Sequence, residues 1–377
     1  MSAVRLPPAT RRPGRLRRWA KAWVSPAFID FWASHLDPTW SLERPLARIV
    51  GRRQESHDAV TLLLAPNRHW RGFAPGQHLS LGAEVEGARI SRSYSLSDLL
   101  RADGRLSVTV RHVPGGKLST HLCHHARVGE VLELGPAFGE MTLPSMPTAP
   151  LLFLAAGSGI TPLMAHVRAQ AAQGMPVPLT LVYSARTRAD LCFAGELRGL
   201  AAAHPNFSVH FALTREVATA TNCINATLAS DESLGRVDEA LLAARVPALA
   251  DRIVFACGPG EFVAHARALL ATQVREFQAE AFTPPPRVVE EGGHVQLTLA
   301  ASGRTLEVPR GMPLLAALEA EGIKPAAGCR MGICNTCACG KRSGTSRDLH
   351  TGEATTEPLS ALKLCVSSAV SDLVIDL

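Results

Sequence analysis

The sequence lacks any uninterrupted apolar run long enough to cross a membrane, which takes about 18 residues or more. The longest candidate begins at Pro150 and is broken by two glycines and a proline. The basic start of the chain also lacks the apolar core of a secretory signal, because Arg15 to Lys21 leads into tryptophans and then into Asp30. We therefore expect a cytoplasmic protein without a membrane-spanning segment.

Cysteine is sparse through most of the chain. Four of the nine cysteines stand singly before residue 300, and the other five lie between Cys329 and Cys365. This distribution favours a local metal site over a disulfide framework, so it indicates a reducing compartment. At 377 residues the chain is also too long for one hydrophobic core, and two or three domains are expected.

Acidic residues are missing from the first 29 positions, whereas seven of the first 21 residues are Arg or Lys. Residues 1–42 also hold four of the five tryptophans and two phenylalanines: Trp19, Trp23, Phe28, Phe31, Trp32 and Trp40. This composition is typical of a surface that contacts anionic lipid or a membrane-bound partner. The alternative is a tail followed by a segment that packs on the main body. We expect no nucleic-acid partner.

The pattern of the remaining chain changes along its length. Short strands separated by turns fill residues 43–147 and predict an antiparallel β-barrel or β-sandwich. Residues 148–282 alternate apolar strands, glycine turns and helices, which predicts an α/β domain with a parallel sheet covered on both faces. Residues 283–292 form a linker rich in proline and glycine, and residues 293–377 form a third unit with a hairpin, a helix and a closing strand.

The third unit carries the strongest motif. Cys329, Cys334 and Cys337 have the C-x4-C-x2-C spacing of plant-type [2Fe–2S] sites, and Cys365 can supply the fourth thiolate after 27 intervening residues. Zinc is the competing interpretation, but structural zinc sites usually use two short cysteine pairs, and here one pair is missing. We therefore predict a [2Fe–2S] cluster on these four cysteines, with Cys339 as a small buried side chain in the following strand.

A one-electron cluster cannot accept a hydride, so a flavin must stand between a nicotinamide cofactor and the cluster. Five motifs occur in one order along the chain: RSYS from Arg92, GGKLS from Gly115, GSGITP from Gly157, CGPGEF from Cys257 and CRMGICNTC from Cys329. In this order they resemble the ferredoxin–NADP reductase-like iron–sulfur flavoproteins, the oxygenase and desaturase reductases with a C-terminal plant-type ferredoxin domain. The resemblance implies an antiparallel β-barrel FAD domain, an α/β parallel-sheet nicotinamide domain and an α+β β-grasp ferredoxin domain.

The resemblance also implies flavin-binding residues in the barrel. Arg92 would pair with the flavin pyrophosphate, Tyr94 would lie against the isoalloxazine or ribityl group, and Ser95 would hydrogen-bond near N5. Further cofactor-binding positions are Ser93 and, at the start of the following helix, Gly116, Lys117 and Ser119. There, free backbone amides favour a phosphate. FAD is expected and FMN is the alternative. The histidines of the same helix, His121, His124 and His125, are interpreted as surface and packing residues or as a metal site.

The nicotinamide site is expected at the turn formed by Gly157, Gly159, Thr161 and Pro162, which lacks the G-x-G-x-x-G pattern. Thr161 is predicted to cap the helix and Pro162 to occupy its first position. The resemblance places this turn under the nicotinamide and pyrophosphate, with Cys257 and Gly258 closing the site, and it places Glu280 and Phe282 near the flavin. The catalytic candidates are thus Ser95, Cys257 and Glu280; for Cys257 the alternative is a buried thiol at a strand end.

The second strand of this domain ends without the acid that commonly binds the ribose of NAD. Instead, Ser184, Arg186 and Arg188 offer charge-assisted hydrogen bonds that suit the 2′-phosphate of NADPH. NADPH is therefore the expected nucleotide. NADH remains the alternative, because the arginines could equally form a solvated turn.

These features predict that electrons pass from NADPH through FAD and [2Fe–2S] to an acceptor protein. Residues 1–42 look similar to the start of reductases that serve membrane di-iron fatty acyl desaturases, so the leading hypothesis is such a desaturase, reached by docking at the inner face of the membrane. One alternative is a reductase for a soluble ring-hydroxylating or other oxygenase. Another, from a different class, is a non-catalytic redox or zinc-binding module.

Overall fold

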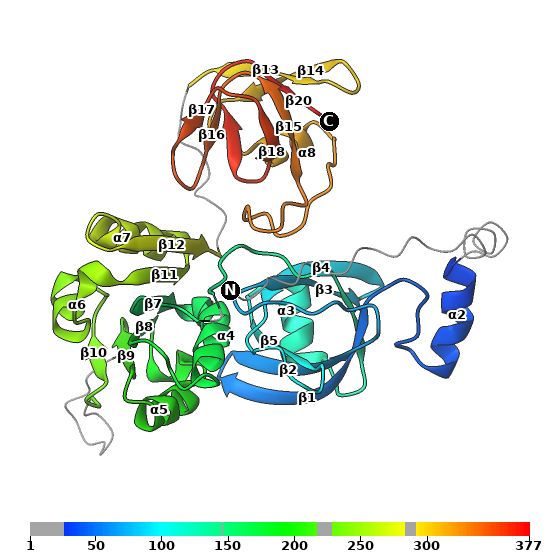
Figure 1. The fold of residues 1–377 in the computed structure, drawn as a ribbon. Helices are drawn as coiled ribbons and strands as arrows, with labels where there is room; N and C mark the ends of the chain where they lie inside the picture. Colours follow the sequence, from blue (N-terminus) through cyan, green and yellow to red (C-terminus); the bar gives the residue numbers. More distant parts are fainter. Residues whose placement is uncertain (1–25, 145, 217–227, 283–291) are drawn as a thin grey trace, which may run out of the picture.

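The computed structural model describes residues 26–144, 146–216, 228–282 and 292–377. Most of the basic leader, with Trp19 and Trp23, lies outside the described residues, as do Cys223 and nearly all of the expected linker. The described chain forms three units in the order that the sequence predicts (Figure 1). Among the described residues, no helix is both long and apolar enough to cross a membrane.

The first unit is an antiparallel barrel around a core of leucine, valine and isoleucine. Its six strands, in the order of the sheet, are β4 (Ala88–Ser95), β3 (His78–Val85), β6 (Val131–Leu134), β1 (Leu46–Ser56), β2 (Ala59–Pro66) and β5 (Leu106–Arg111). A bridge between Leu96 and Val108 joins the two edges and closes the barrel. Helix α3 (Lys117–Thr120) runs into the π-helix η1 (His121–His125), whose buried residues complete the core.

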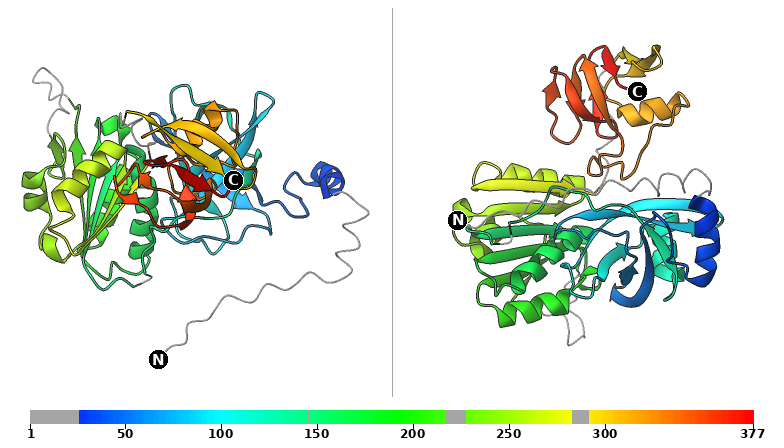
Figure 2. Two further views of the ribbon diagram at one scale, coloured as in Figure 1. Left: turned by 90° about the horizontal axis from the view of Figure 1, so that it is seen from above. Right: turned by 45° about the vertical axis from the view of Figure 1, so that its right-hand side comes forward.

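The second unit is a parallel sheet with helices on both faces, as predicted (Figure 2). Its strands, in the order of the sheet, are β10 (Glu232–Leu234), β9 (Phe207–Leu213), β8 (Leu179–Ala185), β7 (Leu151–Ala156), β11 (Ile253–Gly258) and β12 (Glu276–Ala281). Its helices are α4 (Ile160–Ala171), α5 (Ala194–Ala203), α6 (Glu239–Arg245) and α7 (Gly260–Leu270), and its short 3-10 turns are η2 (Gly157–Gly159), η3 (Arg188–Asp190) and η4 (Leu249–Asp251). Alternate residues of the strands enter two separate cores, one under α4 and α5 and the other under α6 and α7.

The third unit is a mixed sheet with one helix packed on it. The larger sheet holds β14 (Arg304–Pro309), β13 (His294–Leu299), β20 (Leu373–Ile375), β15 (Ala338–Ser343) and β18 (Leu359–Lys363), and the smaller one holds β17 (Ala354–Thr355), β16 (Ser346–Asp348) and β19 (Ser367–Ala369). Helix α8 (Leu314–Ala320) buries its leucines against the sheet. The segment between α8 and β15, drawn in orange, lies on the side of this unit that faces the other two (Figure 1).

A helix outside these units, α2 (Pro26–Leu36), stands at the end of the barrel furthest from the parallel-sheet unit (Figures 1 and 2). It is joined to β1 by a short segment without regular structure. The helix does not cover the place where the first two units meet.

A buried histidine ties helix α4 to the chain that connects the first two units. The side chain of His166 is 1% exposed, and its ring Nε2 lies 3.0 Å from the carbonyl oxygen of Met141, to which it donates. Burial disfavours the charged ring and lowers the pKa of His166 to about 4, although the hydrogen bond to Met141 acts in the opposite direction. The ring is therefore neutral at physiological pH.

The burial of His166 makes stability depend on pH. The unfolded chain gains a proton at this histidine below about pH 6.5, whereas the folded protein gains it only near pH 4. Falling pH therefore favours unfolding through this range, and we expect a loss of about 2 kcal/mol between about pH 7.5 and pH 5. Thermal unfolding at both pH values should show a smaller loss for His166→Gln. Equal losses in wild type and variant would contradict the prediction.

Candidate functional site

Four thiols of the third unit gather in two pairs. Cys329 and Cys334 lie between α8 and β15, and each backbone N–H donates to the other sulfur, at 3.2 and 3.3 Å. Cys337 precedes β15 and hydrogen-bonds to Cys365, which follows β18. This hydrogen bond lowers the pKa of Cys337 to about 6, and it raises the pKa of Cys365. The pairing brings together the cysteines that the spacing predicts.

The spacing of these sulfurs discriminates between iron–sulfur and zinc. Among the described residues, no three of the sulfurs all lie within 4.8 Å of one another. A tetrahedral zinc ion with bonds of about 2.3 Å would hold all four sulfurs about 3.8 Å apart. Two separated pairs instead fit two irons, each held by two thiolates, as in a [2Fe–2S] cluster. The geometry therefore favours the cluster over the zinc alternative.

Backbone amides surround the sulfurs. The N–H of Met331 donates to the sulfur of Cys329, and the N–H of Gly332 donates to that of Cys365, both at 3.3 Å. Gly332 has a φ of +77°, and a Cβ at this position would lie 2.8 Å from a methyl carbon of Val366. Only glycine therefore fits here. Amides that point at thiolates stabilise their negative charge and tune the potential of a cluster that they hold.

The RSYS motif lies on β4, next to β3. Tyr94 pairs with Leu79 and packs against the barrel core, where burial raises the pKa of its hydroxyl. Arg92 is exposed and donates to the neighbouring carbonyl of Ser91, at 2.8 Å. Ser95 is buried and pairs with His78. A solvent-facing arginine beside a half-buried tyrosine is compatible with the flavin contacts that the resemblance implies.

The second flavin motif begins the helix that packs against β3 and β4. The hydroxyl of Ser119 accepts from the N–H of Val113 at 3.2 Å and donates to the carbonyl of Gly116 at 3.2 Å. These bonds fix the turn that opens the helix. The ammonium of Lys117 is exposed and pairs with Glu86 at 3.1 Å. The helix start and the RSYS strand thus lie on adjacent elements, although they are separated in sequence.

The nicotinamide motifs meet at one edge of the parallel sheet. β7 lies between β8 and β11, so the order of the strands along the sheet reverses at β7. Such sheets bind ligands at the carboxyl ends of the strands at this point. Gly157 and Gly159 follow β7, and Cys257 and Gly258 end β11. A Cβ at Gly159 would lie 2.0 Å from the carbonyl oxygen of Cys257, so the two motifs touch backbone to backbone.

The start of helix α4 differs from the prediction. The helix begins at Ile160 and its N-cap is Gly159, so Thr161 is not the cap and Pro162 is the third helical residue instead of the first. The reason is that the 3-10 turn η2 leads directly into the helix. The hydroxyl of Thr161 donates to the carbonyl of Ser158 at 2.9 Å, within this turn.

Cys257 has a fully buried thiol. Its sulfur lies 3.4 Å from the sulfur of Met141, and burial raises its pKa well above the ordinary value. The side chain faces the core between sheet and helix, in agreement with the alternative of a buried thiol at a strand end. A catalytic role of Cys257 stays a prediction.

Glu280 lies between the first two units. It contacts His78, a residue that the sequence analysis did not single out. Its carboxylate contacts the ring Nε2 of His78 at 2.8 Å, and the two side chains are only 10% and 4% exposed. The His78 ring also lies against Phe138 and Phe282. Glu280 comes from the parallel sheet and His78 from the barrel, so this buried pair joins the two units where the resemblance expects the flavin.

The arginines expected to bind the 2′-phosphate have different surroundings. Arg188 pairs with Glu232 at 2.7 Å and with Glu216 at 3.2 Å, and its hydrogen bond lowers the pKa of Glu232 to about 2. Arg186 is exposed, and no carboxylate of the described residues lies within ion-pair distance of it. Ser184 is buried at the end of β8. Arg186 is therefore the better candidate for a phosphate, because Arg188 is already held by carboxylates.

Replacing Arg186 by glutamate should weaken the use of NADPH. We expect kcat/KM for NADPH to fall about tenfold to a hundredfold, since a charge-assisted hydrogen bond contributes about 1.5–3 kcal/mol, while kcat/KM for NADH changes little. Arg245→Glu, at the exposed end of α6, is the matched control. Steady-state reduction of ferricyanide by each variant with both nucleotides checks this. An equal loss with NADPH and NADH would contradict it.

The other candidates have ordinary structural surroundings. The ring Nε2 of His121 lies 2.6 Å from the carboxylate of Glu130, and the ring of His124 lies edge-on to that of His112. Among the described residues, these histidines form no group with metal-site spacing. Cys339 is half-buried in β15, and burial raises its pKa to about 11, so its environment favours a packed thiol.

Comparisons with known proteins agree with this arrangement. The sequence matches the oxidoreductase FAD-binding domain family over residues 47–142, the oxidoreductase NAD-binding domain family over residues 153–268 and the 2Fe-2S iron-sulfur cluster binding domain family over residues 297–369. It is 33% identical to an NADPH oxidoreductase of Mycobacterium tuberculosis, over 98% of this chain and 94% of the relative. It is also 33% identical to the ferredoxin reductase component of 3-ketosteroid-9-alpha-monooxygenase from the same species, over 80% of this chain and 86% of the relative.

Among solved structures, phthalate dioxygenase reductase shares the fold. The match has a TM-score of 0.55 and covers 88% of this chain and 97% of that structure, at 20% identity. The likeness at this identity concerns the fold alone.

Proposed function

Because the chain belongs to the family of oxidoreductases that join an FAD-binding, an NAD-binding and a [2Fe–2S] domain, we propose that it is the reductase component of an oxygenase. It is an electron-transfer enzyme that uses NAD(P)H, FAD and a [2Fe–2S] cluster. When bound, the flavin supplies the step from hydride to single electrons that a cluster needs. The acceptor and the preference for NADPH belong to the proposal.

The observation that carries the electron-transfer part of this proposal is the arrangement of the four thiols in two pairs. It suits a one-electron carrier at the end of a chain whose other two units carry the flavin and nicotinamide motifs. The segment between α8 and β15, which holds Cys329, Cys334 and Cys337 and is called the cysteine loop below, faces those two units (Figure 1). In the proposed enzyme Arg186 binds the nucleotide phosphate, the glycine turn after β7 admits the nucleotide, and Arg92 and Tyr94 orient the flavin.

The oxygenase acceptor is supported by the names of relatives. The monooxygenase component named above is one of them, and glycine betaine monooxygenase reductase subunit of Pseudomonas aeruginosa names the same kind of partner. None of these names mentions a desaturase, so the leading hypothesis drawn from the sequence is not supported and its alternative fits better. NADPH as the donor is supported by the exposed Arg186 and by the name of the M. tuberculosis oxidoreductase.

Isotope labelling distinguishes an oxygenase acceptor from a desaturase acceptor. A monooxygenase uses two electrons to place one atom of O2 in its product and the other in water, whereas a desaturase forms a carbon–carbon double bond and puts both atoms in water. Extracts of the source organism lacking this reductase would be supplied with the purified holoenzyme, NADPH and 18O2. The proposal expects restored formation of a product that carries 18O. Restored unsaturated acyl chains without new labelled product would establish the desaturase instead.

A further inference from the structure

Helix α2 turns its acidic residue toward the segment that connects it to β1 and its large apolar residues toward solvent. Asp30 is 8% exposed, and its carboxylate accepts from the hydroxyl of Ser41 at 2.8 Å and from the N–H of Leu42 at 2.7 Å. The exposed fractions of the outward residues are 60% for Phe28, 57% for Phe31, 57% for Trp32 and 79% for Leu36. Surface helices ordinarily have the opposite arrangement, so this apolar face indicates a partner.

In the sequence, the segment that precedes Asp30 is strongly basic. Residues 1–29 contain seven arginines and lysines and no acid. The first acid, Asp30, is paired with Arg44 at 3.2 Å. Arg68 is exposed next to the helix, and within the described part of the chain no carboxylate pairs with it. The partner should therefore carry negative charge together with apolar surface.

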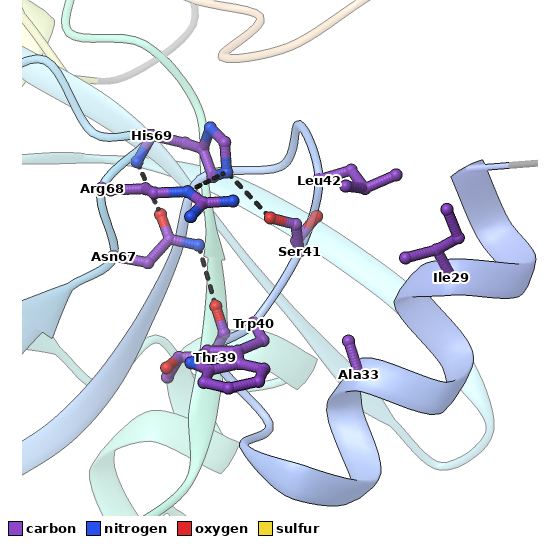
Figure 3. Close-up of a pocket in the computed structure, with 9 residues that line it drawn as sticks. All are labelled: Ile29, Ala33, Thr39, Trp40, Ser41, Leu42, Asn67, Arg68 and His69. Atoms are coloured by element: carbon purple, nitrogen blue, oxygen red, sulfur yellow. Dashed lines mark hydrogen bonds between the residues drawn. The ribbon is translucent and has the colours of Figure 1, made fainter. Parts of the chain in front are cut away.

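A cavity of about 520 Å³ lies between α2 and the segment that follows β2 (Figure 3). Ile29 and Ala33 of the helix form one wall, and Arg68 and His69 line the opposite side. Trp40, which is 55% exposed, lies at the cavity on the segment that connects the helix to β1. An apolar wall opposite a cation suits a molecule with an anionic head and an apolar chain.

We propose that this face, made of α2, Trp40 and Arg68, docks on a bilayer that contains anionic lipid. A convex helix that stands out from the barrel can enter the headgroup layer, where tryptophan and phenylalanine side chains are favoured. Arginine beside such a helix attracts anionic headgroups. Because α2 lies at the far end of the barrel, docking leaves the junction of the first two units and the cysteine loop accessible. The proposal goes beyond electron transfer and does not depend on the acceptor.

Flotation of the full-length holoenzyme with lipid vesicles tests the proposal. Vesicles of phosphatidylcholine alone are compared with vesicles that hold equal parts of phosphatidylcholine and phosphatidylglycerol, at low and high salt. We expect binding to the anionic vesicles, weakened by salt, and about tenfold weaker binding for the double variant Phe31→Ser, Trp32→Ser. The matched control is Leu100→Ser, Val128→Ser, which changes two apolar barrel residues that are 55% and 63% exposed.

Reduction of cytochrome c by each variant, measured without vesicles, verifies that the fold and the cofactors are intact. The proposal is overturned if the holoenzyme does not prefer anionic vesicles, or if the α2 double variant binds like the control. It is also overturned if Arg68→Glu leaves binding at low salt unchanged. Slower electron delivery to an acceptor protein by the double variant, with no vesicle binding by wild type, would assign the face to a protein partner.

Discussion

Replacing Cys334 by alanine is expected to abolish assembly of the [2Fe–2S] cluster and, with it, electron delivery to one-electron acceptor proteins. Cys334 pairs with Cys329, so the substitution leaves one iron position with a single thiolate. Reduction of the flavin by NADPH should stay within about twofold of wild type, because its motifs lie on other units and distant sites act independently. Iron and sulfide content, flavin absorbance under anaerobic NADPH and cytochrome c reduction measure the three effects.

Cys339→Ala is the matched control for this experiment. Cys339 lies two positions beyond Cys337 but in strand β15, where it packs against the core of the third unit. We expect this variant to keep a full cluster content and full acceptor reduction, with at most a small loss of stability. If the Cys334 variant kept its cluster, or if the Cys339 variant lost it, the proposed set of ligands would be wrong.

Replacing Glu280 by glutamine is expected to slow reduction of the bound flavin by NADPH about tenfold to a hundredfold. The carboxylate joins the two cofactor units through its buried contact with His78, and loss of this contact loosens the geometry in which nucleotide and flavin would meet. Small displacements of reacting groups reduce rates by such factors. Anaerobic stopped-flow measurement of flavin bleaching gives the rate directly.

Glu276→Gln is the control, since Glu276 lies on the same strand and is exposed. Flavin content and thermal stability should be retained in the Glu280 variant, and His78→Gln should reproduce its slower reduction. A rate in the Glu280 variant equal to that of wild type would show that the pair with His78 does not position the reaction. A variant that loses its flavin would instead assign the pair to cofactor binding.

The sequence was most informative where function depends on residues close together in the chain. Three of the four paired cysteines lie within nine residues, and the glycine turn after β7 is a contiguous motif, so spacing and local clearance could predict both. The barrel and the parallel sheet could also be predicted from the sequence. A segment of short strands precedes one in which apolar strands alternate with helices, and each has its own pattern of apolar residues.

Contacts between distant residues could not be predicted in the same way. His78 meets Glu280 across 202 positions, and no local pattern distinguishes this histidine from a packing residue. In the sequence, Arg188 and Arg186 were equally suitable for binding a phosphate. In the structure, Arg188 is paired with Glu216 and Glu232, which are distant from it in the sequence. The sequence also could not predict which face of α2 is exposed. The partners of Asp30 lie on the following segment, which folds back on the helix.

The proposed enzyme carries electrons within one chain from NADPH through FAD to the four-cysteine cluster. Anaerobic addition of NADPH to the purified holoenzyme, followed by flavin absorbance and by electron paramagnetic resonance, tests this electron path directly. We expect flavin absorbance to fall and the signal of a reduced [2Fe–2S] cluster to appear, whereas the Cys334→Ala protein should show only the first change. A wild-type protein whose flavin is reduced without any cluster signal, or whose flavin does not respond to NADPH, would contradict this electron path.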